Sequence, residues 1–121
     1  MKTIRSSNKN IDEHINNLEV VRGSNIFAEY TPRNSNLYVV YSYGYHFPMY
    51  VYDTRSEMWF ANSDRYSVST SKHQSQARPS QPIELDLTTD EMMTFLRMGS
   101  YKEWTIHKAQ MDTVDTFRQG V

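Results

Sequence analysis

Nine aromatic residues fall between residues 37 and 60, and this concentration constrains the fold more than any other feature of the chain. Within it, Leu37, Val39, Tyr41 and Tyr43 recur at every second position, which is the side-chain period of a β-strand. β-Branched and aromatic side chains also suit the pleated surface of a sheet. The segment therefore predicts strands, and it carries more rings than one sheet face can bury.

Turn residues divide this part of the chain into four short strands. They are expected at residues 26–31, 37–43, 49–53 and 58–61. Because the connections between them are too short for a crossover helix, neighbouring strands must run antiparallel. The sequence thus predicts an α+β domain with an antiparallel sheet of four to five strands, built on a meander over residues 26–61.

The strongest helix signal lies before Gly99. Thr88 followed three residues later by Glu91 is a capping box, and Gly99 suits a left-handed C-terminal cap. We expect a covering helix at about residues 88–98, packed on the sheet face that carries Leu37.

A short helix is also expected near the N-terminus. Ile11, Ile15 and Leu18 recur at helical spacing after Asn10, a residue type that suits a helix cap. Residues 1–10 are basic and polar, and they are predicted to form a flexible arm.

Residues 62–82 have a different composition, with six serines, few aliphatic residues and a local excess of positive charge. A polar loop of this length is usually functional, disordered or partly structured. We expect a short helical turn within residues 71–77, capped by Ser69 or Thr70.

Composition limits the function further. A chain of 121 residues fits a single domain over residues 1–121, and a net charge of −1 gives no global attraction to nucleic acid. The lack of cysteine excludes disulfides and thiolate chemistry. No metal-binding or phosphate-loop motif occurs, so no metal or cofactor is expected. No apolar run approaches the roughly 18 residues of a membrane span, which favours an intracellular protein without membrane contact.

The excess of rings, together with the basic loop, predicts a recognition surface. An exposed aromatic sheet can stack bases or form a protein-binding hot spot. In the alternative arrangement, helices cover both faces and the tyrosine hydroxyls reach solvent only at the rim. The candidate binding residues are Tyr43, Tyr45, His46, Asn62, Arg65, Tyr66, Ser67, Thr70, Lys72, His73 and Arg78.

His46 and His73 are also candidates for catalysis. If the polar loop folds back on the hairpin, the two imidazoles could act as acid and base on a phosphodiester, with Lys72 or Arg65 holding the phosphate. No complete catalytic set is present, which favours a binding protein over an enzyme.

Two segments carry a resemblance to a known family. The run YSYGYHFP (residues 41–48) and the run NSDRYSVSTSKHQSQARP (residues 62–79) resemble a family of small bacteriophage and prophage proteins that has no assigned activity. The resemblance implies a viral origin and an accessory role in the cytoplasm of an infected bacterium, such as host takeover or the blocking of a defence system. Residues 1–25 and 83–121 lie outside it.

Three functions remain open. A host or phage protein is the favoured partner, because the local excesses of positive charge lie in the loop and the N-terminal arm and are opposed by acids at residues 84–91. The alternatives are a nucleic-acid-binding protein or metal-independent phosphodiesterase, and a structural virion component. The sequence leaves the oligomeric state open.

Overall fold

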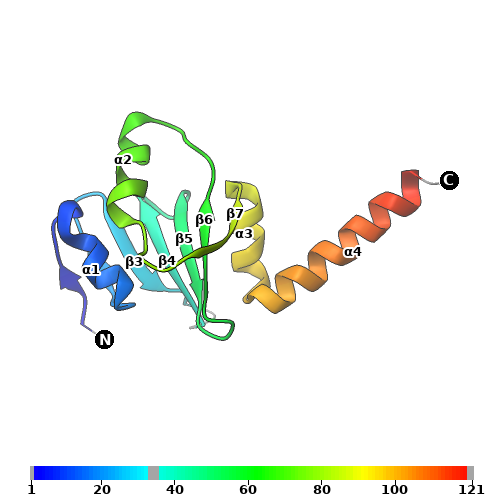
Figure 1. The fold of residues 1–121 in the computed structure, drawn as a ribbon, viewed down its shortest axis with the longest axis horizontal. Coiled ribbons are helices and arrows are strands. Elements are labelled where there is room, and N and C mark those ends of the chain that lie inside the picture. The colour runs from blue at the N-terminus through cyan, green and yellow to red at the C-terminus, as the bar shows by residue number, and fades with distance from the viewer. Residues whose placement is uncertain (1, 33–35, 120–121) are drawn as a thin grey trace.

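A computed structural model describes residues 2–32 and 36–119 of the chain. These residues form one mixed sheet of seven strands, which lie side by side in their order along the chain (Figure 1). The strands are β1 (Ile4–Arg5), β2 (Val21–Arg22), β3 (Ile26–Tyr30), β4 (Leu37–Ser42), β5 (Pro48–Asp53), β6 (Met58–Asn62) and β7 (Ile83–Leu87). The helices are the 3₁₀ turn η1 (Asn8–Asn10), α1 (Ile11–Asn16), α2 (Val68–Ala77), α3 (Thr89–Met98) and α4 (Tyr101–Gln119).

The antiparallel meander predicted over residues 26–61 is confirmed by β3 to β6. Val39 of β4 lies opposite Val51 of β5, which in turn lies opposite Phe60 of β6. The α+β class is likewise confirmed. The described part of the sheet has seven strands rather than four to five, because β1, β2 and β7 extend its edges.

The additional strands include the two parallel pairs of the sheet. β1 pairs with β2, with Ile4 opposite Val21, and β7 pairs with β6, with Leu85 opposite Phe60. Parallel pairing requires a crossover connection, which α1 and α2 provide. The flexible arm predicted over residues 1–10 is wrong where β1 and η1 form. The sequence pattern did not indicate β1, because a strand of two residues has no alternation to detect.

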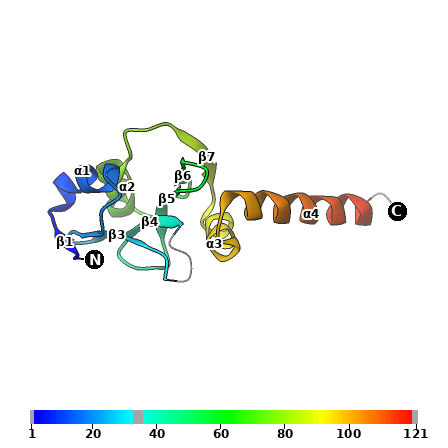
Figure 2. The ribbon, with the colours of Figure 1, turned by 90° about the horizontal axis from the view of Figure 1, so that it is seen from below.

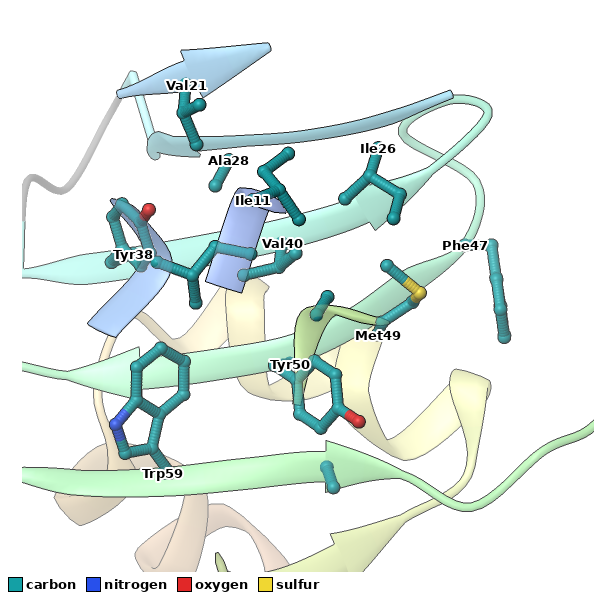
Figure 3. Packing of buried hydrophobic residues seen from close by; sticks show 13 residues of the cluster. Ile11, Val21, Ile26, Ala28, Tyr38, Val40, Phe47, Met49, Tyr50 and Trp59 are labelled. Carbon is teal, nitrogen blue, oxygen red and sulfur yellow. The ribbon is translucent and has the colours of Figure 1, made fainter. Parts of the chain in front are cut away.

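Helices cover both faces of the sheet. α1 and α2 lie on one face, and α3 with the first turn of α4 lies on the other (Figures 1 and 2). Side chains of β4 alternate between the two layers: Tyr38 and Val40 pack toward α1 and α2, and Leu37 and Val39 toward α3. Figure 3 shows the first layer, where Ile11 of α1 lies over the strands and α3 lies behind them.

The predicted covering helix is confirmed as α3. Thr88 and Glu91 form the capping box through reciprocal bonds of 3.2 and 3.0 Å. Gly99 ends the helix at φ 87°, a conformation that glycine adopts at little cost. Met92 and Phe95 are fully buried against the expected face of the sheet.

The predicted N-terminal helix is present in a shorter form. Ile11 and Ile15 of α1 are buried, but Leu18 lies beyond the end of the helix with φ 57°. The Asn10 side chain makes no capping bond; Ser7 instead caps η1 by accepting a bond from the Asn10 amide.

The prediction that the sheet presents an exposed aromatic surface is wrong. Tyr38, Tyr41 and Tyr50 are 0%, 6% and 3% exposed, because the helices close both faces over them. Trp59 is also buried, at 6.2 Å from Tyr38 between ring centroids. The structure has the alternative arrangement: among the described residues, the aromatic rings that are more than half exposed are Tyr43, Tyr45 and Tyr66, near the β4–β5 turn.

Helix α4 was not predicted, and among its described side chains, residues 101–113, the buried one is Trp104 near its start. The Tyr101 amide donates to the Asp53 carboxylate at 2.6 Å, and Trp104 is buried against Phe95. The helix then leads away from the sheet (Figure 2). Beyond Trp104, its described side chains contact α3 through the Lys108–Glu91 ion pair but none of them is buried, which explains the weak periodicity. Over the described residues, no helix combines the length and apolar character needed to cross a membrane.

We expect Met92→Asp to lower the free energy of unfolding by at least about 3 kcal/mol, because it removes a fully buried side chain and buries an unpaired charge. Chemical denaturation followed by circular dichroism measures the change. Met93→Asp is the matched control, since Met93 is 40% exposed and its replacement should cost no more than about 0.5 kcal/mol. Equal losses in the two variants would contradict the packing of α3.

Candidate functional site

The turn between β4 and β5 brings several candidate residues to one end of the sheet. Tyr43, directly after β4, has a left-handed backbone with φ 66°. Its amide donates to the Asn25 carbonyl at 2.7 Å, and the Gly44 amide donates to the Ser42 carbonyl at 2.8 Å. The left-handed conformation costs about 1–2 kcal/mol. It turns the Tyr43 ring toward α2, and not toward the Leu37 face on which strand alternation places it.

Helix α2 occupies the middle of the predicted polar loop, residues 62–82. Ser67 and Thr70 form a reciprocal capping box with bonds of 3.1 and 3.0 Å. The helix therefore begins at Val68, earlier than the turn predicted within residues 71–77. Thr70 takes the position that glutamate or glutamine has in the usual capping box, which is why the pattern is hard to recognise.

His73 attaches α2 to the sheet. Its Nδ1 lies 2.7 Å from the Ser42 hydroxyl, and both residues are buried. The Tyr43 ring packs on the imidazole with 5.1 Å between centroids, a contact that offsets part of the backbone strain. Burial lowers the pKa of His73, and the charge of Lys72 lowers it further. The His73 ring is therefore neutral at neutral pH.

Asn62 and Asp64 connect the end of β6 to α3. Asn62 is 2% exposed and donates through Nδ2 to the Pro48 carbonyl and the Thr89 hydroxyl, at 2.7 and 3.0 Å. Asp64 accepts a 2.8 Å bond from the Thr89 amide, and this bond is the main reason why the pKa of Asp64 is lowered. Because Asn62 is buried, it can support a binding surface but cannot contact a partner.

Three tyrosines surround the β4–β5 turn and remain more than half exposed; we call them the tyrosine rim. Tyr43, Tyr45 and Tyr66 expose 53%, 57% and 62% of their surface. Besides the Tyr43 contact described above, the Tyr45 hydroxyl donates to the Glu29 carboxylate at 2.9 Å. The Tyr66 ring packs against Phe47 with 4.9 Å between centroids. The rim residues are thus held in defined positions.

A polar cavity of about 340 Å³ lies beside the rim. Four of its lining residues share one side of α2, because they follow the three- and four-residue spacing of a helix face. The lining consists of Asn8, Asn25, Tyr43, Ser69, Lys72, His73 and Gln76.

Four of these lining residues were missed by the sequence reasoning. Asn8 and Asn25 reach the cavity from η1 and from the β2–β3 turn, where the Asn8 side chain accepts a 3.2 Å bond from the Asn25 amide. Ser69 and Gln76 belong to α2. Neutral polar residues in a sequence do not by themselves indicate a binding site. The two asparagines come close to α2 only through the tertiary fold.

His46 and His73 do not share a cavity, as an acid–base pair acting on one phosphodiester must. His46 is exposed in the turn, beside Gly44, and does not line the cavity that His73 lines. No hydrogen bond or ring contact of the described residues joins the two rings. The Ser42–His73 pair has the spacing of a nucleophile and its base, but Ser42 is 0% exposed and no substrate can reach it.

The three cations near α2 lie on two sides of the helix. Lys72 lines the cavity described above, whereas Arg65 and Arg78 line a second, smaller one. No acidic residue occurs in the sequence between residues 65 and 82, so the charge of this region is positive on both sides. Among the residues that the structure describes, no group of three or more His, Cys, Asp or Glu side chains could hold a metal ion.

Comparisons of the chain with models of protein families, with curated proteins and with solved structures gave no match. The resemblance to phage proteins, expected from the motif segments at residues 41–48 and 62–79, stays a prediction. These segments are in contact through the Ser42–His73 bond and the packing of Phe47 on Tyr66.

Acidification should destabilise the protein through His73. The folded state lowers the pKa of His73 below its usual value near 6.5, so the unfolded chain takes up a proton first as the pH falls below about 6.5. The contribution of His73 to stability is complete above that pH, and it declines below it until folded His73 is protonated too.

Thermal unfolding measured from neutral pH to about pH 5 tests this. The loss of stability should be smaller in His73→Gln than in the wild type. His46→Gln is the control, because His46 is exposed, and this variant should keep the wild-type slope. If His73→Gln also kept that slope, His73 would not be the titrating group.

Proposed function

We propose that this chain is a phage-encoded accessory protein that binds a host or phage protein through the tyrosine rim, in the cytoplasm of an infected bacterium. The observation that carries the proposal is the gathering of Tyr43, Tyr45 and Tyr66 around one turn, each more than half exposed and each held by a neighbouring side chain.

The fixed positions of these rings favour binding. Tyrosine supplies a large contact area with few rotatable bonds, and a ring already held in place loses little conformational freedom when a partner covers it. Tyrosine is also enriched among the residues that contribute most to protein–protein affinity. A protein partner fits better than a stacked nucleic acid, because the rings on the sheet faces are sealed beneath helices.

The motif resemblance supports the phage origin. The two segments that carry it supply all three rim tyrosines, and the fold brings the segments together. An accessory role in host takeover or in blocking a defence system is what the resemblance implies, and a binding protein without an assembled catalytic pair suits such a role.

A nucleic-acid partner is the second candidate, favoured by the exposed cations Arg65, Lys72 and Arg78 and by the absence of acidic residues between them in the sequence. Binding to phosphates would weaken steeply with added salt, because each neutralised phosphate releases counterions. Binding through the tyrosine rim would depend on salt much less.

Recovery of partners from infected cells tests the proposal. A tag at the C-terminus is suitable, because α4 leads away from the sheet (Figure 1). Tyr45→Ala and Tyr66→Ala should each weaken capture of the partner about tenfold, since loss of a central interface tyrosine commonly costs more than 1 kcal/mol. Met111→Ala is the control, because Met111 is 49% exposed on α4.

The proposal predicts a bound protein that survives nuclease treatment and is lost in the tyrosine variants but not in Met111→Ala. A partner lost on nuclease treatment would favour the nucleic-acid candidate. Recovery of the chain itself in large assemblies, unchanged by the tyrosine variants, would favour a structural virion component.

A further inference from the structure

Two arginines that flank α2 in the sequence, one before the helix and one at its C-terminal cap, line one small polar cavity, which we call the arginine cavity. Its volume is about 150 Å³. It is lined by Tyr50, Arg65, Ser71, Gln74, Ser75 and Arg78. The last four follow the spacing of one helix face, so they form a single wall of the cavity. Tyr50 comes from β5, and its hydroxyl donates to the Gln74 carbonyl at 2.6 Å.

No ion pair of the described residues involves the arginines of the cavity, and the acidic residue whose pKa the charge of Arg65 helps to lower, Asp64, does not line it. None of its lining residues is acidic, and among the described residues ion pairs join only His14 with Glu19 and Lys108 with Glu91. Arg65 uses one nitrogen, Nη1, to donate to the carbonyls of Asn62 and Asp64. A guanidinium has five N–H donors, so most donors of Arg65 remain for a ligand.

The positive charges of the two arginines affect the pKa of Tyr50, the tyrosine that lines the cavity. Burial raises the pKa of Tyr50, whereas Arg78, through its charge and a hydrogen bond, and Arg65, through its charge, act to lower it. Asp86 is the acidic residue whose charge opposes the arginines, and its effect on the pKa of Tyr50 is smaller than that of either. Two cations therefore dominate the field at this point.

The volume of the arginine cavity and its hydrogen-bond donors indicate which kind of ligand it can hold. With a volume of about 150 Å³, the cavity has room for a ligand as small as one phosphate group. Guanidinium groups bind phosphate oxygens through paired parallel hydrogen bonds. The Ser71 hydroxyl makes no hydrogen bond within the described residues and adds a further donor.

We propose that the arginine cavity binds one terminal phosphate group, with Arg65 and Arg78 contacting its oxygens and Ser71 completing the contact. This site goes beyond the proposed function, because it neither includes the tyrosine rim nor depends on a protein partner. A nucleic-acid strand fits less well, since strand binding needs a continuous basic groove and Lys72 lies on the other side of α2.

Titration of the full-length chain with phenyl phosphate, in about 150 mM salt, tests the site. Isothermal calorimetry measures affinity, and amide NMR shifts should centre on residues 71–78. Arg78→Gln should raise the Kd at least about tenfold, because it removes a charged forked donor. Arg78→Lys should give an intermediate loss, since lysine keeps the charge but not the fork.

Lys72→Gln is the matched control, because it removes the same charge from the opposite side of the same helix and should change the Kd less than about twofold. Arg65→Gln is a second test of the site, and thermal unfolding of each variant checks its fold. Separate arms with inorganic phosphate, a nucleoside 5′-monophosphate and a phosphoserine peptide identify the source of the phosphate.

Equal losses in Lys72→Gln and Arg78→Gln, or no saturable binding up to about 10 mM phenyl phosphate, would overturn the proposal. Tighter binding of an oligothymidylate without a terminal phosphate would also overturn it, in favour of a nucleic-acid strand. The tyrosine variants of the partner-capture experiment remain an independent test, so failure of this site leaves that proposal standing.

Discussion

Strands β4, β5 and β6 carry large apolar or aromatic side chains on both faces, and this two-sided burial determines the rest of the structure. Each large side chain that is fully buried contributes roughly 1.5–3 kcal/mol. Tyr38 on one face and Phe60 on the other are both completely covered. α1 and α2 provide one covering layer, and α3 with the start of α4 provides the other. With both faces closed, the positions left for recognition are the turns and edges of the sheet.

Helix α2 links this core to the candidate sites. Ser67 and Thr70 begin the helix by capping it, and His73, three residues further on, bonds to Ser42 of β4. The spacing of the second motif segment is thus explained by local folding, because its recurring polar residues cap the helix and attach it. The α2 side chains on the two sides of this buried face line two separate cavities. These cavities are the places on α2 where a ligand could bind.

The exposed aromatic residues and the exposed basic residues are separated in this molecule. The tyrosine rim surrounds the β4–β5 turn, whereas Arg65 and Arg78 gather at a small cavity on the flank of α2. A net charge of −1 conceals this arrangement, because the basic region of residues 65–78 is balanced by acids elsewhere, including those at residues 84–91. A protein partner and a phosphate group could therefore bind without competing for the same side chains.

Local pattern in the sequence was sufficient for the meander, for the capping box of α3 and for its burial against Leu37 and Val39, since alternation, helix period and end caps are properties of neighbouring residues. Pairing of β1 and β7 was beyond its reach, because parallel strands are joined through intervening helices and the two residues of β1 carry no period. Exposure of the rings was also decided by tertiary structure, since a tyrosine on either face has the same pattern whether or not a helix covers it. The separation of His46 from His73 has the same cause: their positions relative to each other depend on how α2 packs, and no local rule contains that information.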